Sequence, residues 1–554
     1  MSNFFKSISS LEKCFIDESY ESKKEEKSGR CLRGEEFAFE VVYTGDNMVQ
    51  YPRCTFTLEV VSPLKEHITV RDIESVPVRY ACPPGDDENY LRKTPGLYPD
   101  LLAPIDPLGR IFLTPGMLKA LYVQADVPAD FPAGDCPITL RFTAGEEVHE
   151  VTYTLHIIDA VLPKQETIVT EWFHTDCIAD YYELETFSEK HWENIGKFMK
   201  TAVKNGINAI LTPVFTPPLD TAVGGERRTT QLVDVARTAD ENGNIVWHFA
   251  FDKLDRWIET ALANGVEYFE ISHLYTQWGA GHAPKIMGQD ENGEYRKLFG
   301  WETDSLSDEY RTFLRAFLTA FLDKMKGMGL DKKCLFHISD EPGYDHLEIY
   351  AKARGQIADL LEGYVVMDAL SNFDLYRMGA VANPIPSNDH IEPFLEANIP
   401  NLWTYYCCGQ WYKVSNRLLA MPMARTRVIG MQMWKYNIAG FLQWGYNFYN
   451  SCHSVRHIDP YLITDGDYWV PAGDCFSVYP GENGEALETM HLKGFTMALS
   501  DIRAMKLAEK LCGRDAVLAA LEENCTVTFK EYPADAEWLL GVREKINDLI
   551  ENNI

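Results

Sequence analysis

The chain has 554 residues, which is too long for a single hydrophobic core and indicates two or three domains. Hydrophobic residues make up 46% and charged residues 24% of the chain, as in ordinary soluble proteins. The formal charge is −30, from 52 Lys and Arg against 82 Asp and Glu. This balance argues against nucleic acid as a partner, because phosphate binding requires a basic surface.

The N-terminal sequence has no apolar core of signal-peptide length, and no stretch approaches 18 uninterrupted apolar residues. No membrane association is therefore expected. The 13 cysteines are odd in number and irregularly spaced, and Cys407 and Cys408 are adjacent. Free thiols explain this pattern better than a disulfide framework, so we expect a cytoplasmic protein. Nothing in the sequence indicates the oligomeric state.

Residues 1–163 are predicted to form an N-terminal β-sandwich domain. Apolar and polar residues alternate with a period near two, and Gly, Pro and Asp turns separate the segments. Helical periodicity is scarce here, which is typical of a sandwich. The clearest predicted strands are 37–43, 54–61, 138–142 and 148–158.

From residue 164 the pattern changes to strands that alternate with amphipathic helices, which predicts parallel βα units. The predicted strands are 167–174, 207–212, 266–273, 333–339, 364–370, 379–383, 401–406 and 440–444. The predicted helices are 188–205, 251–264, 308–328 and 346–361. Eight strands in one run predict an α/β fold with a (β/α)8 TIM-like barrel over residues 164–480, in which function lies at the carboxyl ends of the strands.

Two long insertions are expected on that same face of the barrel. Residues 231–248 are predicted to form a hairpin around Asn242-Gly243, and 275–301 contain a second turn at Asn292-Gly293. Long loops in a compact domain are more often functional than idle. Residues 481–554 are predicted to be a helical C-terminal region that packs on the barrel, with helices over 491–511, 515–522 and 533–552.

Two adjacent acids, Asp340 and Glu341, end the fourth predicted barrel strand. Pro342 cannot donate to a β-ladder and biases Glu341 toward an extended backbone. Neighbouring strand residues point to opposite faces, so both acids can share a site only where the pleat breaks, as at a strand end. Two carboxylates there suit glycoside hydrolysis, in which one acid protonates the leaving oxygen and the other stabilises charge at the sugar.

An alternative interpretation assigns both acids to the next helix. Asp340 would then be its N-cap and Glu341 a solvated acid of its first turn, as helix N-termini prefer. A short motif such as Ser-Asp-Glu-Pro has a high false-positive rate by itself. The position at the end of a barrel strand favours catalysis, because the capping interpretation does not predict it.

Several further groups of residues follow predicted strands or lie in the insertions: Glu171–Asp176, Thr212–Asp220, His273–Lys285, Phe299–Trp301, His337–Pro342 and Gln443–Asn447. Together they resemble glycoside hydrolase family 123 and a wider group of bacterial proteins that share a domain of unknown function with it. The resemblance covers the barrel and, more weakly, the β-domain through Tyr98-Pro99-Asp100. It implies a β-sandwich followed by a barrel, and a carbohydrate substrate.

The resemblance also implies an activity. Known members of the family are exo-acting, retaining β-N-acetylgalactosaminidases, in which the 2-acetamido oxygen of the substrate is the nucleophile. Their adjacent acid pair corresponds here to Asp340 and Glu341. Asp340 is then expected to orient the acetamido group. Glu341 is expected to be protonated and to act as general acid and then general base.

Other side chains are expected to contact the sugar, either by reading hydroxyl groups or as an apolar floor. For each one alone, a structural role is about as common, since buried His and Trp are often core residues. These candidates are Trp172, His174, Asp176, His273, Trp278, Lys285, Trp301, His337, Asp368, Tyr405, Trp444 and Asn447. Lys285 and also Arg227 lie in the insertions, where they either bind a polar group or form salt bridges.

No cofactor or metal is expected. His453 and His457 have metal-like spacing but no third ligand nearby in the sequence. The Gly-rich dinucleotide fingerprint, the P-loop and the serine-hydrolase elbow are all missing. Two rivals to the predicted N-acetylhexosaminidase remain: a glycosidase for another sugar, because fold and acid pair do not fix the substrate, and a non-catalytic glycan-binding protein on the same scaffold.

Overall fold

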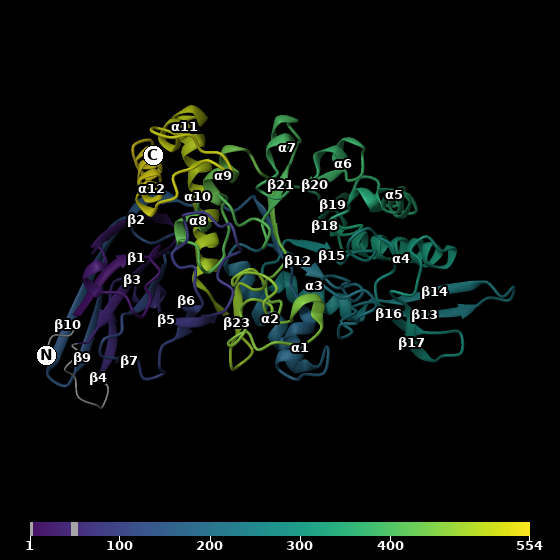
Figure 1. Ribbon diagram of the computed structural model, residues 1–554, viewed down its shortest axis with the longest axis horizontal. Helices are drawn as coiled ribbons and strands as arrows, with labels where there is room; N and C mark the ends of the chain where they lie inside the picture. The colour runs from purple at the N-terminus through teal and green to yellow at the C-terminus, as the bar shows by residue number, and fades with distance from the viewer. Residues whose placement is uncertain (1–3, 46–53) are drawn as a thin grey trace.

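The computed structural model describes residues 4–45 and 54–554. Figure 1 shows a β-rich part at one end of an elongated molecule and a ring of strands and helices at the other. The last helices of the chain lie beside the junction of the two parts. This arrangement is the predicted order of sandwich, barrel and helical C-terminus.

The N-terminal part consists of two five-stranded sheets with strand orders β1-β3-β8-β5-β6 and β2-β10-β9-β4-β7. Apolar side chains from both sheets form a shared core, in which Phe39 stacks on Tyr153 with ring centroids 4.2 Å apart. The predicted β-sandwich is confirmed. The strands are β1 Phe4–Ser9, β2 Ser28–Arg33, β3 Glu36–Thr44, β4 Cys54–Val61, β5 Ile68–Val78, β6 Gly96–Pro104, β7 Arg110–Leu113, β8 Lys119–Asp126, β9 Gly134–Ala144 and β10 Glu147–Val161.

The barrel is built from eight parallel strands in the order β20-β19-β18-β15-β12-β11-β22-β21. A parallel bridge between Ser387 and Tyr405 brings the two edge strands together, so the ring is nearly closed. The predicted (β/α)8 barrel is therefore confirmed. Its strands are β11 Ile168–Glu171, β12 Ala209–Thr212, β15 Tyr268–Ile271, β18 Cys334–Phe336, β19 Val365–Ala369, β20 Asn383–Ile385, β21 Trp403–Tyr405 and β22 Gly440–Gln443.

Two predicted boundaries in the barrel are wrong. The sixth strand was predicted over 379–383 but begins at Asn383, because Gly379, with a φ of +78°, closes the preceding helix α6 (Phe373–Arg377). The helix predicted over 346–361 is α5, Leu347–Gly355, and residues beyond it form turns. Both errors arise where a short helix ends in a turn that hydrophobic periodicity does not reveal.

The longer barrel helices agree with their predicted bounds because their caps are local. In α2 (Glu189–Lys204) and α4 (Asp308–Gly327), Ser188 and Ser307 accept hydrogen bonds from backbone N–H groups of the first turn. The apolar stripes of these helices face the barrel. The remaining helices of this part are α1 Thr175–Tyr181, α3 Asp252–Ala263, α7 Glu392–Glu396, α8 Met423–Arg427 and α9 Ile429–Lys435.

The two insertions combine into one four-stranded sheet with order β14-β13-β16-β17. The hairpins are β13 (Asp234–Ala239) with β14 (Ile245–Ala250), and β16 (Ile286–Gln289) with β17 (Tyr295–Phe299). Parallel pairing of Val235 with Gly288 joins them. Both predicted turns are present, but the joint sheet was not foreseen. It lies at the end of the molecule opposite the sandwich (Figure 1).

The C-terminal helices α10 (Met490–Cys512), α11 (Arg514–Leu521) and α12 (Ala536–Glu551) join the two parts of the molecule, and a short hairpin of β23 (Val478–Pro480) and β24 (Ala486–Glu488) precedes them. In α10, Lys493 is fully buried and pairs with Glu36 of the sandwich. Close contact with α9 depends on Gly430, since a Cβ there would lie 2.2 Å from the Ala498 carbonyl oxygen. The C-terminal region thus packs on both the sandwich and the barrel.

The sandwich also contacts the barrel through the loop between β5 and β6. Asp87 of this loop accepts two hydrogen bonds from the buried guanidinium of Arg425 and a third from the backbone N–H of Lys413. The Tyr80 carbonyl accepts a hydrogen bond from Ala472. The sandwich therefore supports the loops that follow β21 and β22 on the barrel.

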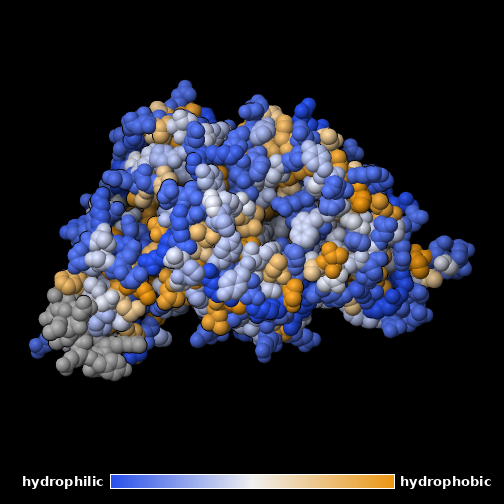
Figure 2. Space-filling view, viewed as in Figure 1, coloured by the Kyte–Doolittle hydropathy of each residue, from blue (hydrophilic) through white to orange (hydrophobic). Residues whose placement is uncertain are grey.

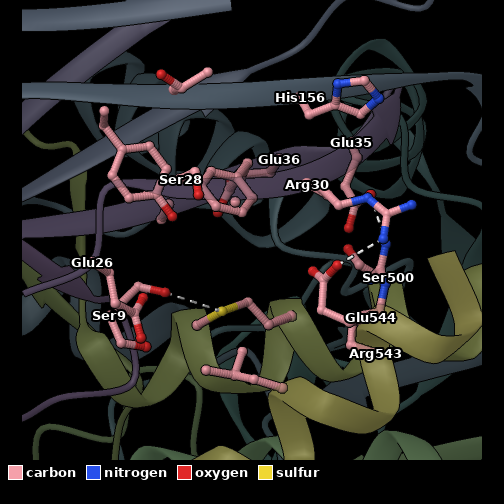
Figure 3. A pocket seen from close by; sticks show the side chains of 18 of the residues that line it. Ser9, Glu26, Ser28, Arg30, Glu35, Glu36, His156, Ser500, Arg543 and Glu544 are labelled. Atoms are coloured by element: carbon pink, nitrogen blue, oxygen red, sulfur yellow. Dashed lines mark hydrogen bonds and ion pairs between the residues drawn. The ribbon is translucent and has the colours of Figure 1, made fainter. Parts of the chain in front are cut away.

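A cavity of about 550 Å³ lies between the sandwich and the C-terminal helices. Its arginines are paired with carboxylates: Figure 3 shows Arg30 beside Glu544 and Arg543 beside Glu35, with separations of 2.9 and 2.8 Å, and Arg427 pairs with Asp501. A cavity whose arginines are already neutralised by neighbouring carboxylates is a seam between packed parts, and we do not treat it as the active site.

The surface is predominantly hydrophilic with small scattered apolar patches, as Figure 2 shows for one face. This agrees with the charge of −30. Among the described helices, none combines the length and the apolar character that a membrane span requires. The cysteines whose side chains the structure describes are free thiols.

Candidate active site

The acid pair lies just beyond the carboxyl end of β18. The strand itself ends at Phe336, but residues 337–340 continue beside the loop that follows β15. Backbone N–H groups of this loop donate to their carbonyl oxygens, and the last of these bonds runs from Trp278 N to the backbone carbonyl oxygen of Asp340 at 3.0 Å. Asp340 is thus held at the face formed by the carboxyl ends of the barrel strands, as the strand pattern predicts.

Glu341 is exposed, and its backbone has a φ of +42°. The expected extended conformation before Pro342 is therefore wrong. Left-handed backbone costs a non-glycine residue about 1–2 kcal/mol, and such strain clusters at functional sites. The Tyr405 hydroxyl, from the end of β21, donates a hydrogen bond to Glu341 Oε1 at 2.7 Å. The turn lifts Glu341 from the strand line and Tyr405 fixes its carboxylate.

The helix-capping interpretation of the acids fails on the same geometry. Helix α5 begins at Leu347, six residues beyond Glu341, and its N-cap residue is His346. No side chain caps that terminus. Neither acid is used by the helix, so both remain available for chemistry.

Asp340 is partly buried, and its pKa is raised well above the ordinary value. Burial is the largest cause, and the neighbouring charge of Glu341 is the next. Asp220 and Asp368 add to the effect, whereas His337 opposes it. Two carboxylates this close do not ionise independently, so the free pair retains a proton to higher pH than either acid alone would.

Two more acids, which were not predicted as contacts, extend the site: Asp220 interacts electrostatically with both acids of the pair, and Asp474 interacts with Asp220. Burial, together with the charges of Glu341 and Asp474, raises the pKa of Asp220 to about 7. Burial likewise raises the pKa of Asp474 to about 6. Asp220 ends one of the segments that carry the family resemblance, so the sequence contained a signal that could have identified it as a site residue. Asp474 follows β22 by thirty residues in an irregular segment, and no sequence pattern marks it.

A row of aromatic rings runs along one side of the site. Trp278 contacts His453 with ring centroids 5.4 Å apart, His453 contacts Trp469 at 5.9 Å, and Trp469 contacts Trp444 at 5.3 Å. The indole N–H of Trp444 donates to Asp474 at 2.9 Å. An apolar wall with polar groups at its ends is the arrangement that sugar rings require.

His337 lies beneath the acid pair and is almost fully buried. Its Nδ1 lies 3.2 Å from Asp368 and its Nε2 lies 2.7 Å from Glu270. Burial opposes a charged imidazole, but the hydrogen bonds with Asp368 and Glu270 raise its pKa to about 10. His337 is therefore an imidazolium between two carboxylates and lies under the acid pair rather than at the surface.

His273, His337 and Asp368 are close enough together to suggest a metal site. An imidazolium has no free lone pair for a metal, because both nitrogens of His337 carry protons. The His273 ring instead stacks on His337 at 4.3 Å, and burial lowers its pKa well below the ordinary value. The residues fit a hydrogen-bonded support for the acid pair better than they fit a metal centre.

Three predicted contacts near β11 and β22, His174, Asp176 and Asn447, form internal structure. Arg227 makes a bidentate salt bridge with Asp176, with both N–O distances 2.7 Å. His174 Nδ1 lies 3.1 Å from the same guanidinium, and burial and that charge lower the pKa of His174 to about 3. Asn447 exchanges two hydrogen bonds with the His174 backbone. Of the two alternatives for Arg227, the structure shows the salt bridge.

The last three predicted contacts, Trp172, Lys285 and Trp301, have partners other than Asp340 and Glu341. Trp172 is buried, and its indole N–H donates to Glu270 at 3.0 Å. Lys285 pairs with Glu226 at 2.9 Å, and Trp301 contacts the His282 ring at 5.8 Å. The structure thus gathers Asp340, Glu341, Trp278, Tyr405 and Trp444 with Asp220 and Asp474, and places the other candidates around or beneath them.

Comparisons with known proteins identify a family and a similar fold. The family model "Glycoside hydrolase 123, catalytic domain" matches residues 172–508. A family 123 glycoside hydrolase from Clostridium perfringens is similar over 100% of this chain and 98% of its own, with 15% identity and a TM-score of 0.73. A β-glucuronidase from Parabacteroides merdae covers 89% of this chain and 51% of its own, with 10% identity and a TM-score of 0.30. No curated protein matches the chain. The chain belongs to glycoside hydrolase family 123.

Proposed function

We propose that the protein is a retaining exo-glycosidase that removes terminal β-linked N-acetylhexosamine, with N-acetylgalactosamine favoured, by substrate-assisted catalysis. The observation that supports this most directly is the pair Asp340 and Glu341 on one turn at the end of β18. The similar structure from Clostridium perfringens is described in terms of glycolipid glycan hydrolysis.

The adjacency of the two acids determines which mechanism fits. In a retaining enzyme with two catalytic carboxylates, these face each other across the anomeric carbon about 5–5.5 Å apart. Asp340 and Glu341 instead rise from one turn and approach the sugar from one side. A nucleophile on the opposite side must come from elsewhere, and the 2-acetamido oxygen of the substrate can reach that position.

The shared proton gives each acid its role. The amide N–H of the bound sugar would donate to Asp340, and a hydrogen bond to the charged form favours ionisation of that carboxyl. Glu341 would then be the member of the pair that transfers a proton to the leaving oxygen. After the leaving group departs, Glu341 would accept a proton from the attacking water. Tyr405 keeps the carboxyl in place through its 2.7 Å hydrogen bond.

The neighbouring groups suit the rest of the sugar. Trp444 and Trp469 offer apolar faces, and Asp220 offers a carboxyl group for a hydroxyl of the sugar, while buried Asp474 holds the Trp444 indole. The nearby guanidinium groups are already engaged, since Arg227 pairs with Asp176 and Arg417 with Glu171. Such a site is suited to an uncharged sugar rather than to an acidic one.

The test compares an aryl β-N-acetylgalactosaminide with the matching aryl β-galactoside. We expect cleavage of the acetamido sugar only, because the plain galactoside lacks the nucleophile. An aryl β-N-acetylglucosaminide in the same assay reports the preference at C4. Cleavage of the plain galactoside at a comparable kcat/KM would contradict the substrate-assisted mechanism and support a glycosidase for another sugar. Binding without turnover of any of the three would support a glycan-binding protein.

A further inference from the structure

Trp278 differs from the other aromatic side chains of the site in its exposure. Its side chain is 37% exposed, whereas Trp444 and Trp469 are only partly accessible beneath it in the same row of rings. The Trp278 backbone N–H donates to the backbone carbonyl oxygen of Asp340 at 3.0 Å, so the main chain that carries this indole is joined to the turn of the acid pair.

The backbone around Trp278 is strained and firmly held. Trp278, Gly279 and Ala280 all have positive φ values, of 56°, 121° and 58°. Gly279 is required because a Cβ there would lie 2.4 Å from the His346 ring. Ala280 N donates to Ser339 Oγ at 3.2 Å, one residue before Asp340. A turn in this conformation persists only when its surroundings enforce it, and strain of this kind clusters at ligand-binding sites.

The strained turn determines where the Trp278 indole lies, and this position suits ligand binding. The turn presents a large apolar ring to solvent, with His453 supporting it from the inner side at 5.4 Å. An aromatic ring that is already fixed loses little conformational entropy when a ligand stacks on it. Sugar rings expose C–H faces that stack on indoles. The structure therefore holds a preformed aromatic platform on a turn whose backbone is hydrogen-bonded to that of Asp340.

The site has an inner and an outer tryptophan. Trp444 is anchored to buried Asp474 and lies at the inner end of the row of rings, where the terminal sugar of an exo-acting enzyme would be enclosed. Trp278 lies at the outer end, next to the acids that act on the glycosidic oxygen. We propose, on the basis of the function proposed above, that Trp278 stacks on the sugar that forms the leaving group, so that the substrate is a glycan with at least one sugar beyond the terminal residue.

The test uses two substrates with alkoxide leaving groups that differ in size: methyl β-N-acetylgalactosaminide and a β-linked N-acetylgalactosaminyl-galactose disaccharide. We expect Trp278→Ala to lower kcat/KM for the disaccharide by roughly tenfold more than for the methyl glycoside, since an aromatic stacking contact is worth about one factor of ten. Trp278→Phe should recover most of the loss. Tyr295→Ala is the matched control, because Tyr295 is an exposed aromatic, at 62%, on the distant β17 hairpin.

A binding measurement keeps this proposal separate from the catalytic one. Calorimetry on the Glu341→Gln protein compares the Kd of the same two compounds, with and without Trp278→Ala. We expect the disaccharide to bind about tenfold more tightly than the methyl glycoside, and the difference to vanish in Trp278→Ala. If the wild-type chain hydrolyses neither compound yet shows this difference, the proposed activity fails and the platform stands. Equal losses on both compounds, an unchanged difference in Trp278→Ala, or no disaccharide binding would overturn the platform.

Discussion

Replacing Glu341 by Gln is expected to lower kcat/KM by about 10²–10⁴-fold, the usual contribution of a general acid. The amide is nearly isosteric and keeps an oxygen for the hydrogen bond from Tyr405, so the loss reflects the missing proton rather than a displaced side chain. The reduction should be larger for a methyl glycoside than for an activated aryl glycoside, because only a poor leaving group requires full protonation.

Two further variants from the same part of the chain show whether the loss is specific to Glu341. Asp345→Asn removes an exposed acid four residues beyond Glu341 and should change kcat/KM by less than about twofold, as is usual for surface positions. Asp340→Asn should lower the rate on both aryl and methyl N-acetyl sugars, since orientation of the acetamido group is needed whatever the leaving group. Near-full activity of Glu341→Gln on the methyl glycoside would show that the general acid lies elsewhere.

Replacing His337 by Phe is expected to lower the free energy of unfolding by about 3–5 kcal/mol, the cost of leaving buried charges unpaired. The imidazolium lies between Glu270 and Asp368, with distances of 2.7 and 3.2 Å, and all three side chains are almost fully buried. Phe fills a similar volume, so packing loss contributes little. Urea denaturation of both proteins measures the difference, and His248→Ala, on the exposed face of a hairpin, serves as the control.

The same pair of proteins should differ in the pH dependence of stability. The pKa of His337 is raised from 6.5 to about 10 in the folded state. The stabilisation from its charge is therefore fully present below about pH 6.5 and is lost as pH rises toward 10. The wild-type protein should lose its advantage over His337→Phe across this range. A difference that stays constant from pH 6 to pH 10 would contradict the assignment of an imidazolium.

Much of the fold could be predicted from the sequence because its signals are local. Serine caps and glycine stops determine α2 and α4, and alternating residues determine the sandwich strands. Strand β18 lies within its predicted range of 333–339 for the same reason, although it ends at Phe336, and the acid pair follows its carboxyl end as predicted. The sixth strand was misplaced because Gly379 closes a helix of only five residues, which is too short to show a period.

The composition of the site was less predictable because it depends on tertiary structure. The rule that a residue before proline is extended is a local preference, and at Glu341 it is overridden by the packing of the turn and the bond to Tyr405. Asp474 reaches the site from an irregular segment without periodicity. His337 and Asp368 were predicted as sugar contacts, but burial makes them partners of each other. Residue type and strand position do not distinguish a side chain at the surface from one beneath it.

The central claim is that the acetamido oxygen of the substrate is the nucleophile. Its most direct test is the hydrolysis of aryl β-N-acetylgalactosaminides in which fluorine atoms are added one at a time to the acetyl methyl group. Fluorine withdraws electrons from the amide oxygen, so kcat/KM should fall with each addition, by on the order of a hundredfold or more in total, because that oxygen bonds to the anomeric carbon in the transition state. A rate that does not change along the series would show that a protein side chain or water attacks instead, and would contradict the mechanism proposed for Asp340 and Glu341.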